Sequence, residues 1–250
     1  MGADASPVVE TLTPIGRRIE RASELLTVYE FAREVLEFYI RIAQFQRAVR
    51  EDFDHLADRM PELLSVVESF GPPPLAAASA EVRERGRPPW TNLLAAFWNT
   101  REAGTAVETF LAKTLLQPYS ERLDFPAGVY HGRLCPRCRS KPVVGVLRPE
   151  GHGAKRTLLC SLCSLEWQFP RIECPACGEQ SAEGLSIYTA EQFEAVRVEA
   201  CEKCRIYLTC VDLTRNGLAV PQVDELAMIP LDLWAREQGY VKLQSNFLGL

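Results

Sequence analysis

The residues of this chain with the clearest chemistry are its nine cysteines, none of which lies before residue 135. Eight of them form four Cys-x-x-Cys pairs: Cys135 and Cys138, Cys160 and Cys163, Cys174 and Cys177, and Cys201 and Cys204. A secreted disulfide scaffold is usually short and scatters its cysteines at varied spacings. Four identical spacings in a chain of 250 residues therefore indicate cytoplasmic metal binding.

Two Cys-x-x-Cys turns together supply the chemistry of one metal site. Each turn points two thiolates inward, so that a pair of turns gives four sulfur ligands in the tetrahedral arrangement that zinc and iron accept. A unit of ~40 residues has too small a core to fold well alone, so the metal supplies much of its folding free energy. We therefore expect all eight paired cysteines to be metal ligands.

An internal repeat indicates which pairs share a metal. The sequence CPRC begins at Cys135 and CPAC at Cys174, and the next pair follows after 21 residues in the first unit and 23 in the second. In both units a β-like run precedes the second pair and an apolar, aromatic run follows it. The repeat thus favours one site from 135/138 with 160/163 and another from 174/177 with 201/204.

Two other arrangements remain open at this point. The pairs 160/163 and 174/177 are separated by only ten residues, SLEWQFPRIE, and could share one metal; a cross-braced pairing of 135/138 with 174/177 is also possible. If the pairs share metals as the repeat indicates, these ten residues join the two modules, with Trp167 and Phe169 packed between them.

The metal itself does not follow from the spacing. Rubredoxin-type iron turns commonly have Gly directly after the second Cys, where the backbone reverses. Only Cys177 is followed by one, Gly178, whereas Arg139, Ser164 and Arg205 take this place in the other turns. These three residues must accept a turn that glycine adopts more readily.

The chain changes character near residue 128. Before it, apolar residues recur at helical period in 17–50 and 53–70, and Gly71-Pro-Pro-Pro74 then interrupts the pattern. A further long helix is expected at about 91–116. Together these segments predict a bundle of about four helices. After it, short β-like runs lie between or at the ends of the cysteine pairs, at 142–147, 155–160, 166–169, 195–200 and 206–213. Helical character returns at 222–238, where Pro230 should kink or split the helix.

The predicted fold class is therefore α+β: a helical bundle, two tandem rubredoxin-like or zinc-ribbon-like Cys₄ modules, and a short helical C-terminal segment. The predicted domains are a flexible leader (1–14), the bundle (15–128), the first module (129–170), the second module (171–214) and the C-terminal segment (215–250).

The other reactive side chains suggest no catalytic group. His55 lies among acidic residues on a polar helix face, and His152 is expected at a solvated hairpin tip. Cys210 lies in an apolar run and is expected to be a small buried hydrophobe.

Charge and hydropathy limit the possible partners. The net charge of the chain is −5, and no apolar run approaches the ~20 residues of a membrane helix. Residues 129–210 contain eleven Lys and Arg against nine Glu, a balance that two four-thiolate centres would make negative. This composition gives poor support to RNA binding, although residues 133–156 are locally basic.

Several motifs of the second half resemble the formate dehydrogenase accessory protein family FdhE: LCPRCRSKPVV (134–144), LLCSLCSLEWQFPRIECPACGE (158–179), CEKCRIYL (201–208) and the C-terminal DELAMIPLDLWAREQGY. The resemblance covers roughly 134–250. It departs from the family pattern at Arg139, where a glycine generally follows the first turn.

The resemblance implies a cytoplasmic, non-enzymatic assembly factor that contacts the catalytic subunit of formate dehydrogenase. It also implies two bound metal ions, iron being suspected and zinc the alternative, held by the eight paired cysteines. From the residues alone, a rubredoxin-like electron carrier and a zinc-ribbon RNA-binding module remain alternative functions.

Overall fold

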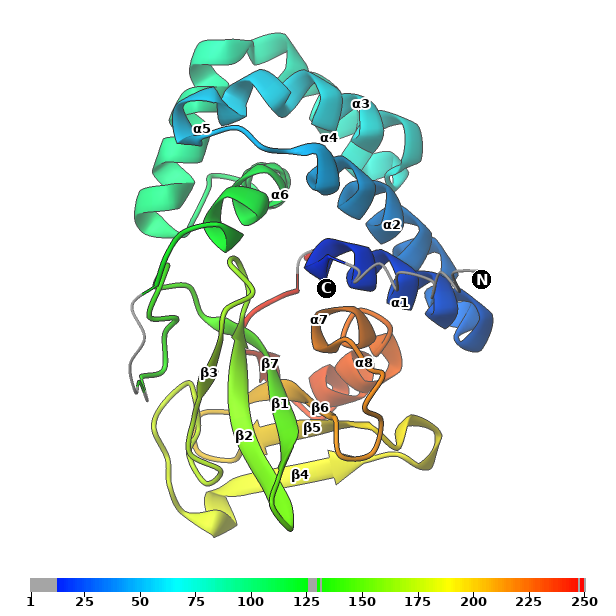
Figure 1. The fold of residues 1–250 in the computed structure, drawn as a ribbon, viewed down its shortest axis with the longest axis vertical. Helices are drawn as coiled ribbons and strands as arrows, with labels where there is room; N and C mark the ends of the chain where they lie inside the picture. Colours follow the sequence, from blue (N-terminus) through cyan, green and yellow to red (C-terminus); the bar gives the residue numbers. More distant parts are fainter. Residues whose placement is uncertain (1–12, 126–129, 131, 247, 250) are drawn as a thin grey trace, which may run out of the picture.

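The first half of the chain forms six helices in a computed structural model that describes residues 13–125, 130, 132–246 and 248–249. The helices are α1 (Pro14–Val28), α2 (Arg33–Ala48), α3 (Met60–Phe70), α4 (Pro73–Arg85), α5 (Arg87–Thr100) and α6 (Ala106–Glu121) (Figure 1). Short 3₁₀ turns at Glu30–Ala32 and Phe53–Arg59 separate the first three. Residues 1–12 of the predicted leader lie outside the described residues. Helix α1 begins at the end of the predicted leader, because Thr13 caps the helix and Pro14 occupies its first position.

The prediction of a single helix at 91–116 is wrong, since this stretch is divided between α5 and α6. Arg101 adopts a left-handed conformation with φ of 65° and ends α5. A capping box then starts α6, in which Thr105 accepts from the backbone N–H of Glu108 and the Glu108 carboxylate accepts from that of Thr105. Two reciprocal caps thus replace the continuous helix that the apolar pattern suggested.

The second half of the chain forms one continuous mixed sheet. Its strands are β1 (Pro142–Glu150), β2 (Gly153–Cys160), β3 (Glu166–Gln168), β4 (Leu185–Thr189), β5 (Val196–Cys201), β6 (Ile206–Asp212) and β7 (Val241–Lys242). Their spatial order is β3-β2-β1-β6-β5-β4, and β7 also pairs with β6. The sheet therefore runs through both cysteine-containing units without interruption.

The two units meet through a parallel pairing of β1 with β6. Val144 lies opposite Thr209 and Val146 opposite Val211 in this register. The ten residues between the units contribute as well, because Arg156 of β2 donates to the carbonyls of Pro170 and Glu173 at 2.9 and 3.1 Å. The junction is thus mainly a strand pairing, to which the linking segment adds two backbone carbonyls that accept hydrogen bonds from Arg156.

The C-terminal segment covers one face of this sheet. It contains α7 (Pro221–Asp224) and α8 (Ile229–Glu237), which are separate helices with Pro230 in the first turn of the second. Both helices lie against the sheet, and α1 packs on α7 (Figure 1). Apolar residues of the three helices and of the sheet form one buried cluster. None of the helices in the described ranges is long and apolar enough to span a membrane.

Candidate metal centres

The structure brings the eight paired cysteines together in two groups of four. Cys135, Cys138, Cys160 and Cys163 form the first group, and Cys174, Cys177, Cys201 and Cys204 form the second; within each group the sulfur atoms lie within 4.8 Å of one another. This is the grouping that the repeat favours. Neither the nearest-neighbour nor the cross-braced arrangement occurs among the described residues.

The sulfur positions suit a tetrahedral ion. A metal–sulfur bond of ~2.3 Å gives a tetrahedron with an edge of ~3.8 Å. In the second group, the Cys174–Cys204 and Cys177–Cys201 sulfur distances are 3.8 and 3.7 Å. In the first group, Cys135–Cys163 and Cys138–Cys160 are slightly closer, at 3.5 and 3.3 Å. All nine cysteines are free thiols, so no disulfide competes for these positions.

All four Cys-x-x-Cys turns share one backbone geometry. The residue after the second cysteine adopts positive φ in each: Arg139 at 64°, Ser164 at 53°, Gly178 at 81° and Arg205 at 57°. Three non-glycine residues therefore adopt the left-handed turn at a cost of ~1–2 kcal/mol each. Backbone N–H groups also point at sulfur, since those of Leu162 and Cys163 both lie 3.4 Å from Cys160 Sγ.

The first site is enclosed by the helical domain. Its four cysteines are at most 2% exposed, and they belong to the same buried cluster as apolar residues of α2, α3, α5 and α6. The break between α5 and α6 contributes directly, because the Arg101 Nε donates to the Cys138 carbonyl at 2.7 Å. The helical half thus forms part of the wall of this site.

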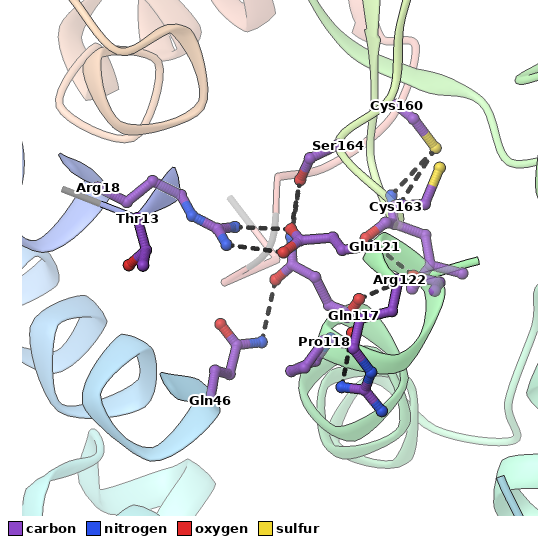
Figure 2. Close-up of polar contacts among 12 residues, drawn as sticks. Thr13, Arg18, Gln46, Gln117, Pro118, Glu121, Arg122, Cys160, Cys163 and Ser164 are labelled. Atoms are coloured by element: carbon purple, nitrogen blue, oxygen red, sulfur yellow. Dashed lines mark hydrogen bonds and ion pairs between the residues drawn. The ribbon is translucent and has the colours of Figure 1, made fainter. Parts of the chain in front are cut away.

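The carboxylate of Glu121, at the C-terminal end of α6, links α1 to the first site (Figure 2). Arg18 of α1 donates two hydrogen bonds of 2.9 Å to it. The Ser164 hydroxyl, next to Cys163, donates a third of 2.7 Å. One carboxylate therefore fixes both the first helix and the second turn of the site.

Thiol protonation within the first site is uneven. Hydrogen bonds from Cys135, Cys160 and Cys163 hold the pKa of Cys138 far below its usual range, whereas burial raises the pKa of Cys160. Close by, burial lowers the pKa of Lys113 of α6 to about 8, and the charge of Cys160 opposes this shift. A divalent ion with four thiolates has a net charge of about −2, which a charged Lys113 partly compensates.

The second site is open to solvent on one side. Cys174 and Cys201 are buried, Cys204 is partly exposed and Cys177 is exposed. Burial raises the pKa of Cys204 to about 12. Burial would raise the pKa of Cys177 too, but hydrogen bonds from the Glu179 backbone and the neighbouring thiols lower it. The exposed edge is consequently also the edge with the more acidic thiol.

The remaining candidate residues lie away from both groups. Cys210 is fully buried in β6, opposite Gly145, as expected for a small hydrophobe. His55 is exposed and lies 3.4 Å from the carboxylate of Asp58. His152 is exposed in the turn between β1 and β2. None of the three belongs to a cysteine group.

The helical domain and the sites together define a class of protein: a helical domain followed by two Cys₄ modules fused in one sheet. Comparison with known proteins agrees. Residues 134–171 match the family model "FdhE, central domain", and residues 172–248 match "FdhE, C-terminal domain".

Similar proteins extend the match into the helical half. A "Protein FdhE homolog" of Aquifex aeolicus is 28% identical over 79% of this chain and 71% of its own length. Another, of Pseudomonas aeruginosa, is 28% identical over 93% of this chain and 88% of its own length. The crystal structure of the FdhE protein from Pseudomonas aeruginosa has the same fold, with a TM-score of 0.68 over 94% of both chains at 23% identity. The chain belongs to the FdhE family.

Proposed function

We propose that this protein is a formate dehydrogenase accessory protein, which binds the catalytic subunit of the enzyme and supports its activation without turnover of its own. The observation that carries the proposal is the use of all eight paired thiols in two four-sulfur groups. A closed four-thiolate site has no open coordination position for a substrate, and its usual role is structural. Membership of the FdhE family supports formate dehydrogenase as the enzyme served.

Two metal ions would be held by these eight cysteines. The donor set fits them, because four sulfur atoms surround each position and the sulfur distances approach a tetrahedral edge. Bound metal would fix the Cys-x-x-Cys turns that connect β2 to β3 and β5 to β6 in the shared sheet. Iron is the metal suggested by the family and by the common rubredoxin-like turn, and zinc is the alternative.

We place the docking surface for the subunit on the second module and the C-terminal segment. Beside the second site, an apolar cavity of about 220 Å³ is lined by Pro175, Leu185 and Leu208. Two residues of its rim, Ile172 and Ile187, are 54% and 56% exposed. Ile187 belongs to β4, an edge strand with no charged residue to discourage pairing with another chain. Exposed apolar side chains next to a free strand edge favour a protein partner.

Co-purification tests this proposal. Tagged protein should retain the formate dehydrogenase catalytic subunit from cells that express both, and an Ile187→Glu variant should retain at least tenfold less. Val28→Glu is the matched control, because Val28 is 61% exposed at the end of α1, away from the cavity. Absence of the subunit from wild-type eluates would contradict the function, whereas equal retention by Ile187→Glu would contradict only the surface.

The exposed edge of the second site favours one further candidate, electron transfer. With iron in the site, Cys177 would place a thiolate ligand in contact with solvent and with a redox partner. This candidate predicts a visible ferric-thiolate spectrum that bleaches reversibly on reduction. Protein isolated anaerobically as a colourless two-zinc form would exclude it.

RNA binding is less well supported, since the basic residues of 133–156 are partly neutralised. Arg148 pairs with Glu166, Lys155 with Glu150 and Arg156 with Glu199. Among the described residues, this stretch therefore does not form a continuous surface of unpaired basic side chains.

A further inference from the structure

A second cavity, of about 490 Å³, lies where the helical domain, the first module and the C-terminal segment meet. Pro14 and Arg17 of α1 line it on one side, Cys163 and Ser164 of the first site on another, and Val220 and Gln222 on a third. Small-molecule sites are commonly cavities of ~300–1,000 Å³ at such junctions. This cavity is separate from the apolar cavity beside the second site.

The charged residues around this cavity are unbalanced. Four arginines line it, against two glutamates: Arg17, Arg18, Arg137 and Arg148 face Glu121 and Glu166. Both glutamates are already paired, Glu121 with Arg18 at 2.9 Å and Glu166 with Arg148 at 2.6 Å. The arginines that remain are Arg17 and Arg137.

Neither remaining arginine has an ion-pair partner within the described part of the chain. Arg137 donates only a long hydrogen bond of 3.4 Å to the Glu121 carbonyl, and its Nε is buried without an acceptor. A buried donor without a partner is unfavourable, and a bound water or ion is one of the ordinary ways in which such a donor is satisfied. Arg17 is exposed at the rim, and its side chain forms no hydrogen bond with another described residue that would compete with a ligand.

We propose that this cavity binds the phosphate group of a small molecule, held between Arg17 and Arg137. A phosphate group has a charge of about −1.5 to −2 at pH 7, which balances two guanidinium groups where one carboxylate would not. The guanidinium fork also matches phosphate geometry, and a bound phosphate would replace the long hydrogen bond that Arg137 Nη1 donates to the Glu121 carbonyl.

Binding at this place would connect three parts of the chain. Arg17 lies on α1, Arg137 lies inside the first Cys-x-x-Cys turn, and Gln222 lies in α7. A phosphate held by both arginines would therefore stabilise the folded junction by mass action. This consequence gives a readout that does not depend on formate dehydrogenase.

Equilibrium dialysis of the metal-loaded full-length protein against labelled inorganic phosphate at low salt tests the proposal. The expected result is one saturable phosphate per chain, together with a rise in melting temperature at phosphate concentrations that saturate it. Arg17→Gln should weaken binding at least tenfold and reduce the rise, since it removes one of the two charge-assisted partners of the phosphate.

Two controls separate this result from others. Arg47→Gln removes an exposed arginine from the last turn of α2, outside the cavity, and should bind phosphate like the wild type. Arg137→Gln should also weaken binding, with metal content measured in parallel because Arg137 lies between two metal-binding cysteines. No saturable binding below ~10 mM phosphate, or equal weakening by Arg17→Gln and Arg47→Gln, would overturn the proposal.

Discussion

The Ser164 hydroxyl donates a 2.7 Å hydrogen bond to the carboxylate of Glu121, and thereby joins the first metal site to the helical domain. Ser164 follows directly after Cys163, and Glu121 is the last residue of α6. Arg18 of α1 binds the same carboxylate from the other side. The helical half and the first module therefore share polar contacts as well as an apolar cluster.

Removing the Glu121 carboxylate should destabilise this connection. Glu121→Ala leaves Arg18, only 3% exposed, without its ion-pair partner, and should lower the free energy of unfolding by about 2 kcal/mol. Glu121 is itself 24% exposed, which is why the expected loss is smaller than for a fully buried pair. Urea unfolding measures it. Arg33→Ala, which breaks an exposed pair with Glu30, should cost less than ~0.5 kcal/mol; equal losses would refute the linking role of Glu121.

Glycine should stabilise the first Cys-x-x-Cys turn. Arg139 has a φ of 64° and an exposed side chain, so Arg139→Gly should relieve left-handed strain and raise the free energy of unfolding by about 1 kcal/mol. Arg205→Gly relieves similar strain, but it also loses an ion pair to Glu202 and the contact with the Tyr240 ring. It should therefore gain less, or lose stability. Thermal unfolding of the two metal-loaded variants compares them, and a loss of stability in Arg139→Gly would contradict the argument.

The two sites should release metal at different rates. The first has four buried ligands, whereas Cys177 of the second is exposed. A chelator should therefore remove one metal ion per chain quickly and the other much more slowly. Cys177→Ser should abolish the fast phase and leave a folded helical domain. Cys135→Ser should lower global stability, because Cys135 is part of the helical domain's apolar cluster. Release of both ions in a single phase would show that the sites are not independent.

Glu199 should contribute to the loss of stability in acid. Burial opposes its ionisation, but Arg156 and Arg197 hold the pKa of its carboxyl below the ordinary 4.5. A group with a lowered folded-state pKa stabilises the protein above its unfolded-state pKa, and this contribution is lost as the pH falls through the folded-state value. The stability difference between wild type and Glu199→Gln should thus be constant near pH 7 and shrink below about pH 4.5. Urea unfolding at several pH values tests this, and a difference independent of pH would contradict it.

The sequence predicted the parts of this protein that leave a local signal. The Cys-x-x-Cys spacing and the repeated loop lengths predicted the thiol grouping, and the β-like runs predicted β1, β2, β3, β5 and β6. The break between α5 and α6 was missed, although Thr105 and Glu108 have the spacing of a capping box. Strand β4 was missed as well, where Leu185 and Ile187 alternate with more polar residues.

Contacts between distant segments left no such signal. The parallel pairing of β1 with β6 joins residues more than sixty positions apart, and periodicity within either strand is the same with or without it. The same holds for Arg101 at the Cys138 carbonyl and for Glu121 beside Ser164. Each is an ordinary polar residue near a helix end, and only the packing of the helical domain against the first module gives it a place at the metal site.

Metal quantification combined with X-ray absorption on anaerobically purified protein tests the central claim most directly. The account predicts two metal ions per chain, each with four sulfur neighbours at ~2.3 Å, and one ion in a variant with Cys174 and Cys177 both changed to Ser. A single ion in the wild type, or nitrogen and oxygen ligands in place of sulfur, would contradict it.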